Sequence, residues 1–400
     1  MTMTCCACAA GDLVADLRVA GEMGHRGLAP TTDAFGVALS DLVHCTACGH
    51  RQLERMPSDA ALGEAYGEAA SDDYIGEEAG QRETARRALA RIERWMPGAG
   101  APGPGAPPAR GTPAAPGPPR LLDLGCWVGF LLAEARERGW EGVGVEPSAF
   151  ASTYARERLG LDVRREGLLD ADLPAGAFDA GILGDVIEHL PRPGAALDRV
   201  ATLLRTGGPR LAWLSLPDAG SRVARAMGAR WWSVIPTHVQ YFTRGSLATL
   251  LHRHGWEVLE VATAPKAFTV RYYLERTGGY SPTAARALVR AARLAGVADR
   301  MWAPDFHDAC GHRPGAGVAR RRPLSARLRA RASQECSAIV SFRARPGRRP
   351  RAPRPGAHDR RGQAPAPAPT PPSSLPFSAL PTIAAPALCA RRSKRRTSPI

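Results

Sequence analysis

Short apolar runs alternate with amphipathic stretches along residues 120–262, and this alternation is the strongest structural signal in the chain. The apolar runs predict strands at 120–124, 142–145, 180–183, 210–216 and 256–262. Between them, apolar residues recur at helical spacing and predict helices at 130–138, 149–159, 194–204 and 244–254. Strands that alternate with helices are typical of a doubly wound α/β sheet. In such sheets the ligand binds at the carboxyl ends of the strands.

The same pattern, read with local composition, divides the chain into five segments. They are a cysteine-bearing segment 1–57, a helical connector 58–96, a linker 97–119, the α/β domain 120–306 and a tail 307–400. In the connector, apolar residues from Ala85 to Met96 fall on one helical face. The linker is almost wholly Pro, Gly and Ala, so it has no side chains to bury. The tail is rich in Arg, Pro and Ala, and we expect it to be disordered.

The net charge of +15 changes this picture little, because most of the excess lies in the tail. Residues 311–400 hold 20 Lys and Arg against two acidic residues, which leaves the rest of the chain near neutral. No apolar run approaches the roughly 18 residues of a membrane span, and the first twenty residues lack the order of a signal peptide. We therefore expect a soluble cytoplasmic protein whose nine cysteines stay reduced.

A glycine-punctuated turn follows the first predicted strand, in the sequence LLDLGCWVGF at 121–130. Gly125 and Gly129 would let the backbone approach a ligand, although they could also serve turn geometry alone. A dinucleotide site needs a glycine where Trp127 stands, so NAD is disfavoured. Glu146 ends the next predicted strand, where a carboxylate can accept hydrogen bonds from two ribose hydroxyls. The pattern predicts a nucleoside ligand with an unphosphorylated ribose.

These motifs, followed by DVIEHL at 185–190, LRTGG at 204–208 and HVQYF at 238–242, resemble the class I S-adenosylmethionine-dependent methyltransferases over about residues 120–262. The resemblance implies a Rossmann-like sheet of seven strands. It places the methionine part of the cofactor near Asp123, Gly125 and Gly129, the ribose at Glu146, and the adenine beside residues 168–170. The predicted cofactor-binding residues are Asp123, Gly125, Cys126, Gly129, Glu146, Leu168, Asp170 and Asp185. Trp127 departs from the family's small residue, and it crowds the cofactor, offers an indole face to the sulfonium, or turns outward.

Two histidines are candidate catalytic bases, since transfer of a methyl group to a hydroxyl requires a positioned nucleophile and a proton acceptor. His189 follows the strand at 180–183, and His238 lies close to aromatic residues at 231, 232, 241 and 242. Each could instead serve packing or a backbone hydrogen bond. The aromatic residues, with those at 272 and 273, line an acceptor pocket or belong to the core.

A divalent metal site is a further alternative at this segment. Asp185, Glu188 and His189 are spaced i, i+3 and i+4, and some quinone-precursor O-methyltransferases that the segment resembles use a metal there. We favour the simpler interpretation of a solvated helix start, where acidic residues interact well with the helix dipole.

Two pairs of cysteines in the first segment have the spacing of zinc knuckles. Cys5 and Cys8 form one pair, and Cys45 and Cys48 form the other. Four thiolates from two such pairs can surround one tetrahedral zinc ion. Cys6 is an alternative ligand, and unpaired thiols in a loose segment are the other possibility. The prediction is a structural zinc in a ribbon-like module, as occurs in some methyltransferases of this kind.

The predicted function is methyl transfer from S-adenosylmethionine to an oxygen or carbon of a small molecule. The alternatives are an RNA methyltransferase whose basic tail binds the phosphates of RNA, and a non-catalytic nucleoside-binding protein. The last strand of the sheet is due near residues 304–308, where the composition changes. A change of reading frame near residue 308 would leave a sheet edge unpaired and the protein prone to aggregate, unless residues 338–342 supply the strand.

Overall fold

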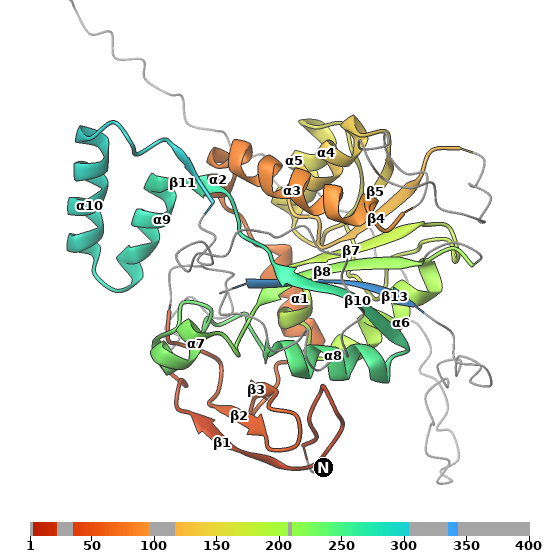
Figure 1. Ribbon diagram of the computed structural model, residues 1–400, viewed down its shortest axis with the longest axis horizontal. Coiled ribbons are helices and arrows are strands. Elements are labelled where there is room, and N and C mark those ends of the chain that lie inside the picture. The colour runs from red at the N-terminus through yellow and green to blue at the C-terminus, as the bar shows by residue number, and fades with distance from the viewer. Residues whose placement is uncertain (1–2, 22–34, 97–116, 207–209, 304–334, 343–400) are drawn as a thin grey trace, which may run out of the picture. The chain divides into compact units, whose positions relative to one another are not determined.

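A seven-stranded sheet with helices on both faces organises the chain (Figure 1). The computed structural model describes residues 3–21, 35–96, 117–206, 210–303 and 335–342. All of them belong to one compact unit of the chain. The strand order is β10-β13-β8-β7-β4-β5-β6. The strands are β4 (Arg120–Leu124), β5 (Glu141–Val145), β6 (Asp162–Arg164), β7 (Ala180–Gly184), β8 (Leu211–Pro217), β10 (Trp256–Thr263) and β13 (Glu335–Phe342). The predicted doubly wound α/β sheet is confirmed.

Helices cover the two faces of this sheet and bury a separate core on each. On one face lie α3 (Glu78–Glu93), α4 (Phe130–Glu137) and α5 (Ala149–Glu157), and on the other α6 (Pro193–Leu203) and α8 (Arg244–Arg253). Leu89, Leu132 and Ile182 belong to the first core, and Leu124, Leu197 and Leu250 to the second. Alternate residues of a strand point to opposite faces, so strands buried on both faces read as continuous apolar runs.

The strand that the sequence left in doubt is present. β13 pairs antiparallel with β10 and with β8, and Val340 lies opposite Val258 on one side and Ala212 on the other. Val340 is fully buried. Residues 338–342 therefore supply the strand, and the expected unpaired sheet edge is wrong. The linker at 97–116, the tail at 304–334 and 343–400, and the proposed frame change near residue 308 lie outside the described residues.

The first segment forms a second, antiparallel sheet that takes its last strand from the α/β domain. Its order is β1 (Leu13–Leu17), β2 (Leu42–Cys45), β3 (Arg51–Leu53) and β9 (Gln240–Tyr241). β3 and β9 pair through Arg51 with Tyr241 and Gln52 with Gln240. The cysteine-bearing segment is thus continuous in hydrogen bonding with the loop that carries His238.

Further elements extend the domain; the first two fall within the predicted helical connector 58–96, and the sequence did not predict the others. They are α1 (Asp59–Gly67), α2 (Asp72–Gly76), α7 (Arg222–Met227), β11 (Phe268–Thr269), α9 (Val270–Arg276), α10 (Pro282–Leu294) and β12 (Met301–Trp302). β11 and β12 pair with each other, so the two ends of the segment 268–302, which follows β10, lie side by side. Among the helices of the described residues, none has the length and apolar character needed to cross a membrane.

Candidate active site

A cavity of about 1460 Å³ opens at the carboxyl ends of the central strands. Gly125 after β4, Glu146 after β5 and Asp185 after β7 line it. The volume exceeds the roughly 300–1,000 Å³ of a pocket for one ligand. The cavity therefore has room for a cofactor and an acceptor side by side.

Glu146 is held in a fixed orientation at one end of this cavity. Its Oε2 accepts a hydrogen bond from the backbone N–H of Trp127, and its Oε1 accepts one from the backbone N–H of Ser148, both at 2.9 Å. Burial raises the pKa of Glu146 to about 7. Burial and the nearby charge of Glu146 likewise raise the pKa of Asp123 to about 7. A preoriented carboxylate of this kind suits a ligand that presents two hydroxyls.

Two glycines of the first loop are required by geometry. Gly125 has φ +81°, and a Cβ there would come within 2.5 Å of a methyl group of Val186. Gly129 has φ +84°, and a Cβ there would come within 2.6 Å of Leu161. Both positions favour glycine because a left-handed backbone is strained for other residues. Gly125 leaves the cavity wall without a side chain, and Gly129 begins α4.

The eight predicted cofactor-binding residues divide into two groups in the structure. Five line the cavity, and these are Gly125, Glu146, Leu168, Asp170 and Asp185. Three are buried and are not part of its lining, and these are Asp123, Cys126 and Gly129. The first group can contact a ligand, and the second supports the loop.

Trp127 has an unusual backbone as well as an unusual side chain. Its φ of +49° lies in the left-handed region, a strain of about 1–3 kcal/mol for a residue other than glycine. The indole lines the cavity and meets the rings of Tyr74 and Phe150 at centroid distances of 6.1 and 6.4 Å. In this strained backbone conformation the N–H of Trp127 donates to the carboxylate of Glu146. The strain at Trp127 therefore accompanies the hydrogen bond that orients Glu146.

Both predicted histidines line the same cavity, with ring centroids 4.5 Å apart. Nδ1 of His238 lies 2.8 Å from the carbonyl oxygen of Ser233. A carbonyl only accepts, so Nδ1 carries the proton and Nε2 has the lone pair. Nδ1 of His189 lies 2.9 Å from the carbonyl oxygen of Thr237 and 2.5 Å from the hydroxyl of Tyr66. The same reasoning gives His189 the same tautomer.

Burial keeps both imidazoles neutral. It lowers the pKa of His189 to about 4 and that of His238 well below its usual value. A neutral imidazole with a fixed Nδ1–H and an accepting Nε2 is the form in which histidine takes a proton.

The expected solvated helix start at residues 185–189 is wrong. Asp185 has φ +55°, so the chain turns there, and Ile187–His189 form a single 3₁₀ turn. Glu188 is only 2% exposed. Its carboxylate and one nitrogen each of His189 and His238 lie within 4.8 Å of one another, a set that could hold a divalent cation. The turn therefore brings Glu188 and His189 to His238 rather than to solvent.

The predicted aromatic residues separate into core and cavity. Trp231, Tyr241 and Phe242 are buried in the cores, whereas Trp232, Tyr272 and Tyr273 line the cavity. Sequence reasoning missed further lining residues, namely Phe35, Tyr66, Tyr74, Phe268, Tyr280 and Trp302. The run of aromatic residues from 268 to 280 was the available signal for part of this wall.

Lys266 is a lining residue that the sequence did not single out. It follows β10, and its Nζ lies 2.6 Å from Oδ2 of Asp185. After burial, the charge of Lys266 is a further cause that lowers the pKa of both His189 and His238.

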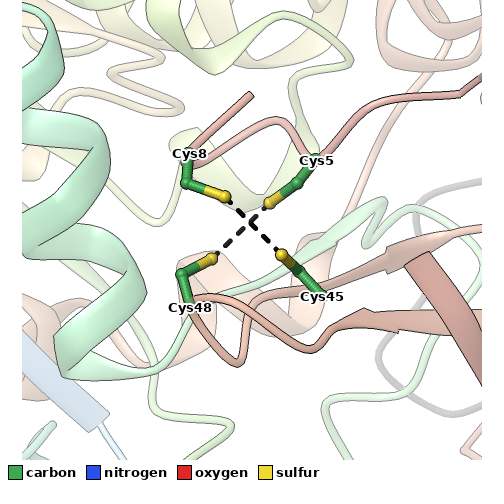
Figure 2. Close-up of side chains that lie close together, drawn as sticks. All are labelled: Cys5, Cys8, Cys45 and Cys48. Atoms are coloured by element: carbon green, nitrogen blue, oxygen red, sulfur yellow. Dashed lines mark hydrogen bonds between the residues drawn. The ribbon is translucent and has the colours of Figure 1, made fainter. Parts of the chain in front are cut away.

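The four predicted cysteines converge on one point, with their sulfur atoms directed toward one another (Figure 2). Sγ of Cys5 lies 3.6 Å from that of Cys48, and Sγ of Cys8 lies 3.5 Å from that of Cys45. A tetrahedral zinc with Zn–S bonds of about 2.3 Å implies sulfur separations of about 3.8 Å. The tetrad is therefore only slightly tighter than a zinc site.

The two cysteine turns have the same local design. The N–H of Ala9 bonds to the carbonyl of Cys5, and the N–H of Gly49 bonds to that of Cys45, each at 2.8 Å. Ala9 and Gly49 both have positive φ, +65° and +70°. Each of the two segments thus turns back after its second cysteine, and this turn brings both thiols of a pair to the same side.

Cys6 lies outside the tetrad and connects it to the α/β domain. The side-chain amide of Gln240 donates to Sγ of Cys6 at 3.3 Å. Arg253 donates to the backbone carbonyls of Cys6 and Ala7 at 3.1 and 2.7 Å. Gln240 is two residues from His238, so the cysteine turn and the histidine loop share one hydrogen-bonded network.

Comparison with known proteins finds similarity to methyltransferases. Residues 83–261 match the family model described as a methyltransferase domain. Residues 83–261, less than half of the chain, are therefore similar to a methyltransferase domain. The chain is 33% identical over 156 residues to a ubiquinone biosynthesis O-methyltransferase of Nitrobacter winogradskyi, covering 35% of this chain and 58% of that protein. It is 29% identical over 151 residues to the protein of the same name from Rhodopseudomonas palustris strain HaA2, covering 35% and 59%. The chain thus spans less than two thirds of these relatives' length.

Solved structures of methyltransferases also resemble the chain, at low identity. An S-adenosylmethionine-dependent methyltransferase from Archaeoglobus fulgidus is 14% identical, with a TM-score of 0.38 and coverage of 68% of this chain and 100% of that one. The 1,6-didemethyltoxoflavin-N1-methyltransferase of Burkholderia thailandensis is 17% identical, with a TM-score of 0.37 and coverage of 55% and 89%.

Proposed function

We propose that this protein methylates a hydroxyl group of an apolar small molecule, with S-adenosylmethionine as methyl donor. The observation that carries the proposal is Glu146, a buried carboxylate held by two backbone amides at the end of β5, in a cavity that continues to His238. The methyltransferase domain and the name of its relatives support the same reaction.

The cofactor end of the cavity fits a nucleoside. Glu146 would accept hydrogen bonds from the ribose, and the bare backbone at Gly125 would lie against the methionine part. Leu168 and Asp170 would flank the adenine. The bound cofactor supplies a methyl carbon activated by the positive sulfur, and its C–S bonding electrons stay on sulfur when the C–O bond forms.

The other end of the cavity provides what the acceptor needs. Nε2 of His238 takes the proton of the acceptor hydroxyl, while the Ser233 carbonyl holds the imidazole by Nδ1. Tyr66 and the Thr237 carbonyl hold His189 in the same way beside it. Trp232, Tyr272 and Tyr273 give the acceptor apolar walls, which favours a small molecule over an RNA strand.

The test is calorimetric titration of the purified protein with S-adenosylhomocysteine, followed by mass spectrometry of the protein as purified. We expect one binding site per chain and a co-purified nucleoside of this class. Binding of neither S-adenosylhomocysteine nor S-adenosylmethionine at millimolar concentration would contradict the proposal.

We also propose that Cys5, Cys8, Cys45 and Cys48 bind a structural zinc ion. The sulfur separations and the paired turns support it. Burial raises the pKa of Cys5 to about 11 and that of Cys48 further, so the metal would have to displace their protons on binding. The ion would stabilise the sheet of β1, β2, β3 and β9.

A further inference from the structure

Lys266 stands out by composition and by position. The chain has 53 lysine and arginine residues, of which only Lys266 and Lys394 are lysines. Arginine therefore serves nearly every basic role in this protein. Lys266 lies in the wall of the cavity that His189 and His238 also line, where it pairs with Asp185.

Groups from several elements face the Lys266 ammonium. Asp185 at the end of β7 is paired with it at 2.6 Å. Its charge lowers the pKa of His189 in the 3₁₀ turn and of His238 before β9, and also acts on Tyr272 of α9. The Lys266 ammonium thus acts electrostatically on His238, the proposed base, and both residues line the same cavity.

Removal of a proton from the acceptor creates a charge that this cavity must stabilise. The O–H bonding electrons stay on the acceptor oxygen, and the proton goes to Nε2 of His238. An oxyanion among aromatic walls loses its hydration, which is costly without a partner. A preorganised cation at that point lowers the cost most in a water-poor site.

We propose that Lys266 binds the ionised oxygen of the acceptor, which makes the acceptor a molecule with an acidic hydroxyl on a planar ring, that is, a phenol. The inference rests on the proposed function. An ammonium is a compact charge whose donors point in several directions, so it can hold Asp185 and a ligand oxygen together. A guanidinium is a rigid planar fork that is suited to a bidentate partner instead. Trp232 and Tyr273 provide faces for a planar ring.

The experiment uses 4-nitrophenol, whose ionised form absorbs visible light, bound to the full-length protein saturated with S-adenosylhomocysteine. Absorbance is followed from pH 5 to pH 9 to give the pKa of the bound phenol. In the wild type we expect this pKa to fall by about one unit or more, a tenfold stronger acid. In Lys266→Met it should return to the value of the free phenol. Lys266→Arg should recover only part of the fall.

Two control variants separate this role from general electrostatics. Lys266→Met leaves Asp185 without its ion pair, so Lys266→Met with Asp185→Asn removes both charges and should also lack the fall. Arg192→Met removes another cation of the cavity wall, one that is paired with Asp59, and should keep the fall. S-adenosylhomocysteine affinity, measured for each single variant at Lys266, should stay within about threefold of the wild type.

The outcomes are distinct. A bound phenol with the same pKa in the wild type and in Lys266→Met would overturn the role of Lys266 and leave the proposed function intact. A wild type that binds S-adenosylhomocysteine but does not bind or acidify 4-nitrophenol would overturn the phenol assignment. A wild type that fails to bind S-adenosylhomocysteine would contradict the proposed function itself.

Discussion

Replacement of Glu146 by alanine should weaken binding of S-adenosylhomocysteine and S-adenosylmethionine by about 1.5–3 kcal/mol, the usual contribution of hydrogen bonds to a charged group. That free energy corresponds to a rise in Kd of about 10- to 150-fold. The expected loss is large because two backbone amides orient the carboxylate before any ligand arrives. Little of the hydrogen-bond energy is then spent on ordering the side chain.

The substitution also has a cost for folding that must be measured separately. Alanine leaves the N–H groups of Trp127 and Ser148 without the acceptor they have in the wild type, and each buried donor without a partner costs about 1–3 kcal/mol. Glu146→Gln keeps one accepting oxygen and should be less destabilised. Thermal unfolding without ligand measures the change in the free energy of unfolding. Calorimetry on the folded fraction measures the change in the free energy of ligand binding.

The pH dependence provides a second signature of the same residue. The pKa of Glu146 is raised from 4.5 to about 7. Its contribution to stability is therefore present in full below pH 4.5 and is lost as the pH rises through 7. Ribose hydroxyls prefer the ionised carboxylate, so ligand affinity should rise over that same interval. Asp123, with its pKa raised from 3.8 to about 7, adds to the loss of stability.

The control is Glu157→Ala, which removes an exposed carboxylate from the end of α5. It should change neither the affinity nor its pH dependence. The reasoning would be refuted if Glu146→Ala, shown to be folded, bound the cofactor as tightly as the wild type across pH 5 to 8.

Three further predictions concern the metal, the base and the last strand. Metal analysis should find about one zinc per chain, absent in Cys45→Ser and retained in Cys6→Ser; a wild type purified without chelator and free of zinc would reject the site. His238→Asn should lower kcat about 10²- to 10⁴-fold with cofactor affinity unchanged, and an unaltered kcat would exclude His238 as the base. Val340→Asp should destabilise the fold by more than about 3 kcal/mol in denaturant unfolding, because it buries a charge in the sheet; wild-type stability would show that β13 is dispensable.

The central sheet could be predicted because its strands and helices have distinct local patterns. The apolar runs at 120–124 and 256–262 are near the observed bounds of β4 and β10. β6 escaped prediction because its three residues are too few for a periodic signal. The sheet of β1, β2, β3 and β9 escaped because a pairing such as Gln52 with Gln240 joins residues far apart in sequence.

The candidate site was predictable only in part, for a related reason. Glu146 and the histidines follow predicted strands or lie within motifs, so topology alone brings them to one edge. Lys266 and Tyr66 were not found, because a lysine after the last predicted strand and a tyrosine in a polar connector have no local pattern. The mistaken helix at 185–189 has its origin in Asp185, whose positive φ cannot be read from residue type.

The walls of the cavity come from different parts of the chain. The carboxylate and glycine wall belongs to the sheet, within residues 83–261 that match the family. The aromatic wall includes Tyr66 before that region and Phe268, Tyr280 and Trp302 after it. Related proteins can thus keep the part of the sheet that would bind the methyl donor, while the segments before and after residues 83–261 diverge. Two chains of this kind could share a donor and differ in what they modify, and grafting residues 263–302 between them is a direct way to exchange acceptors.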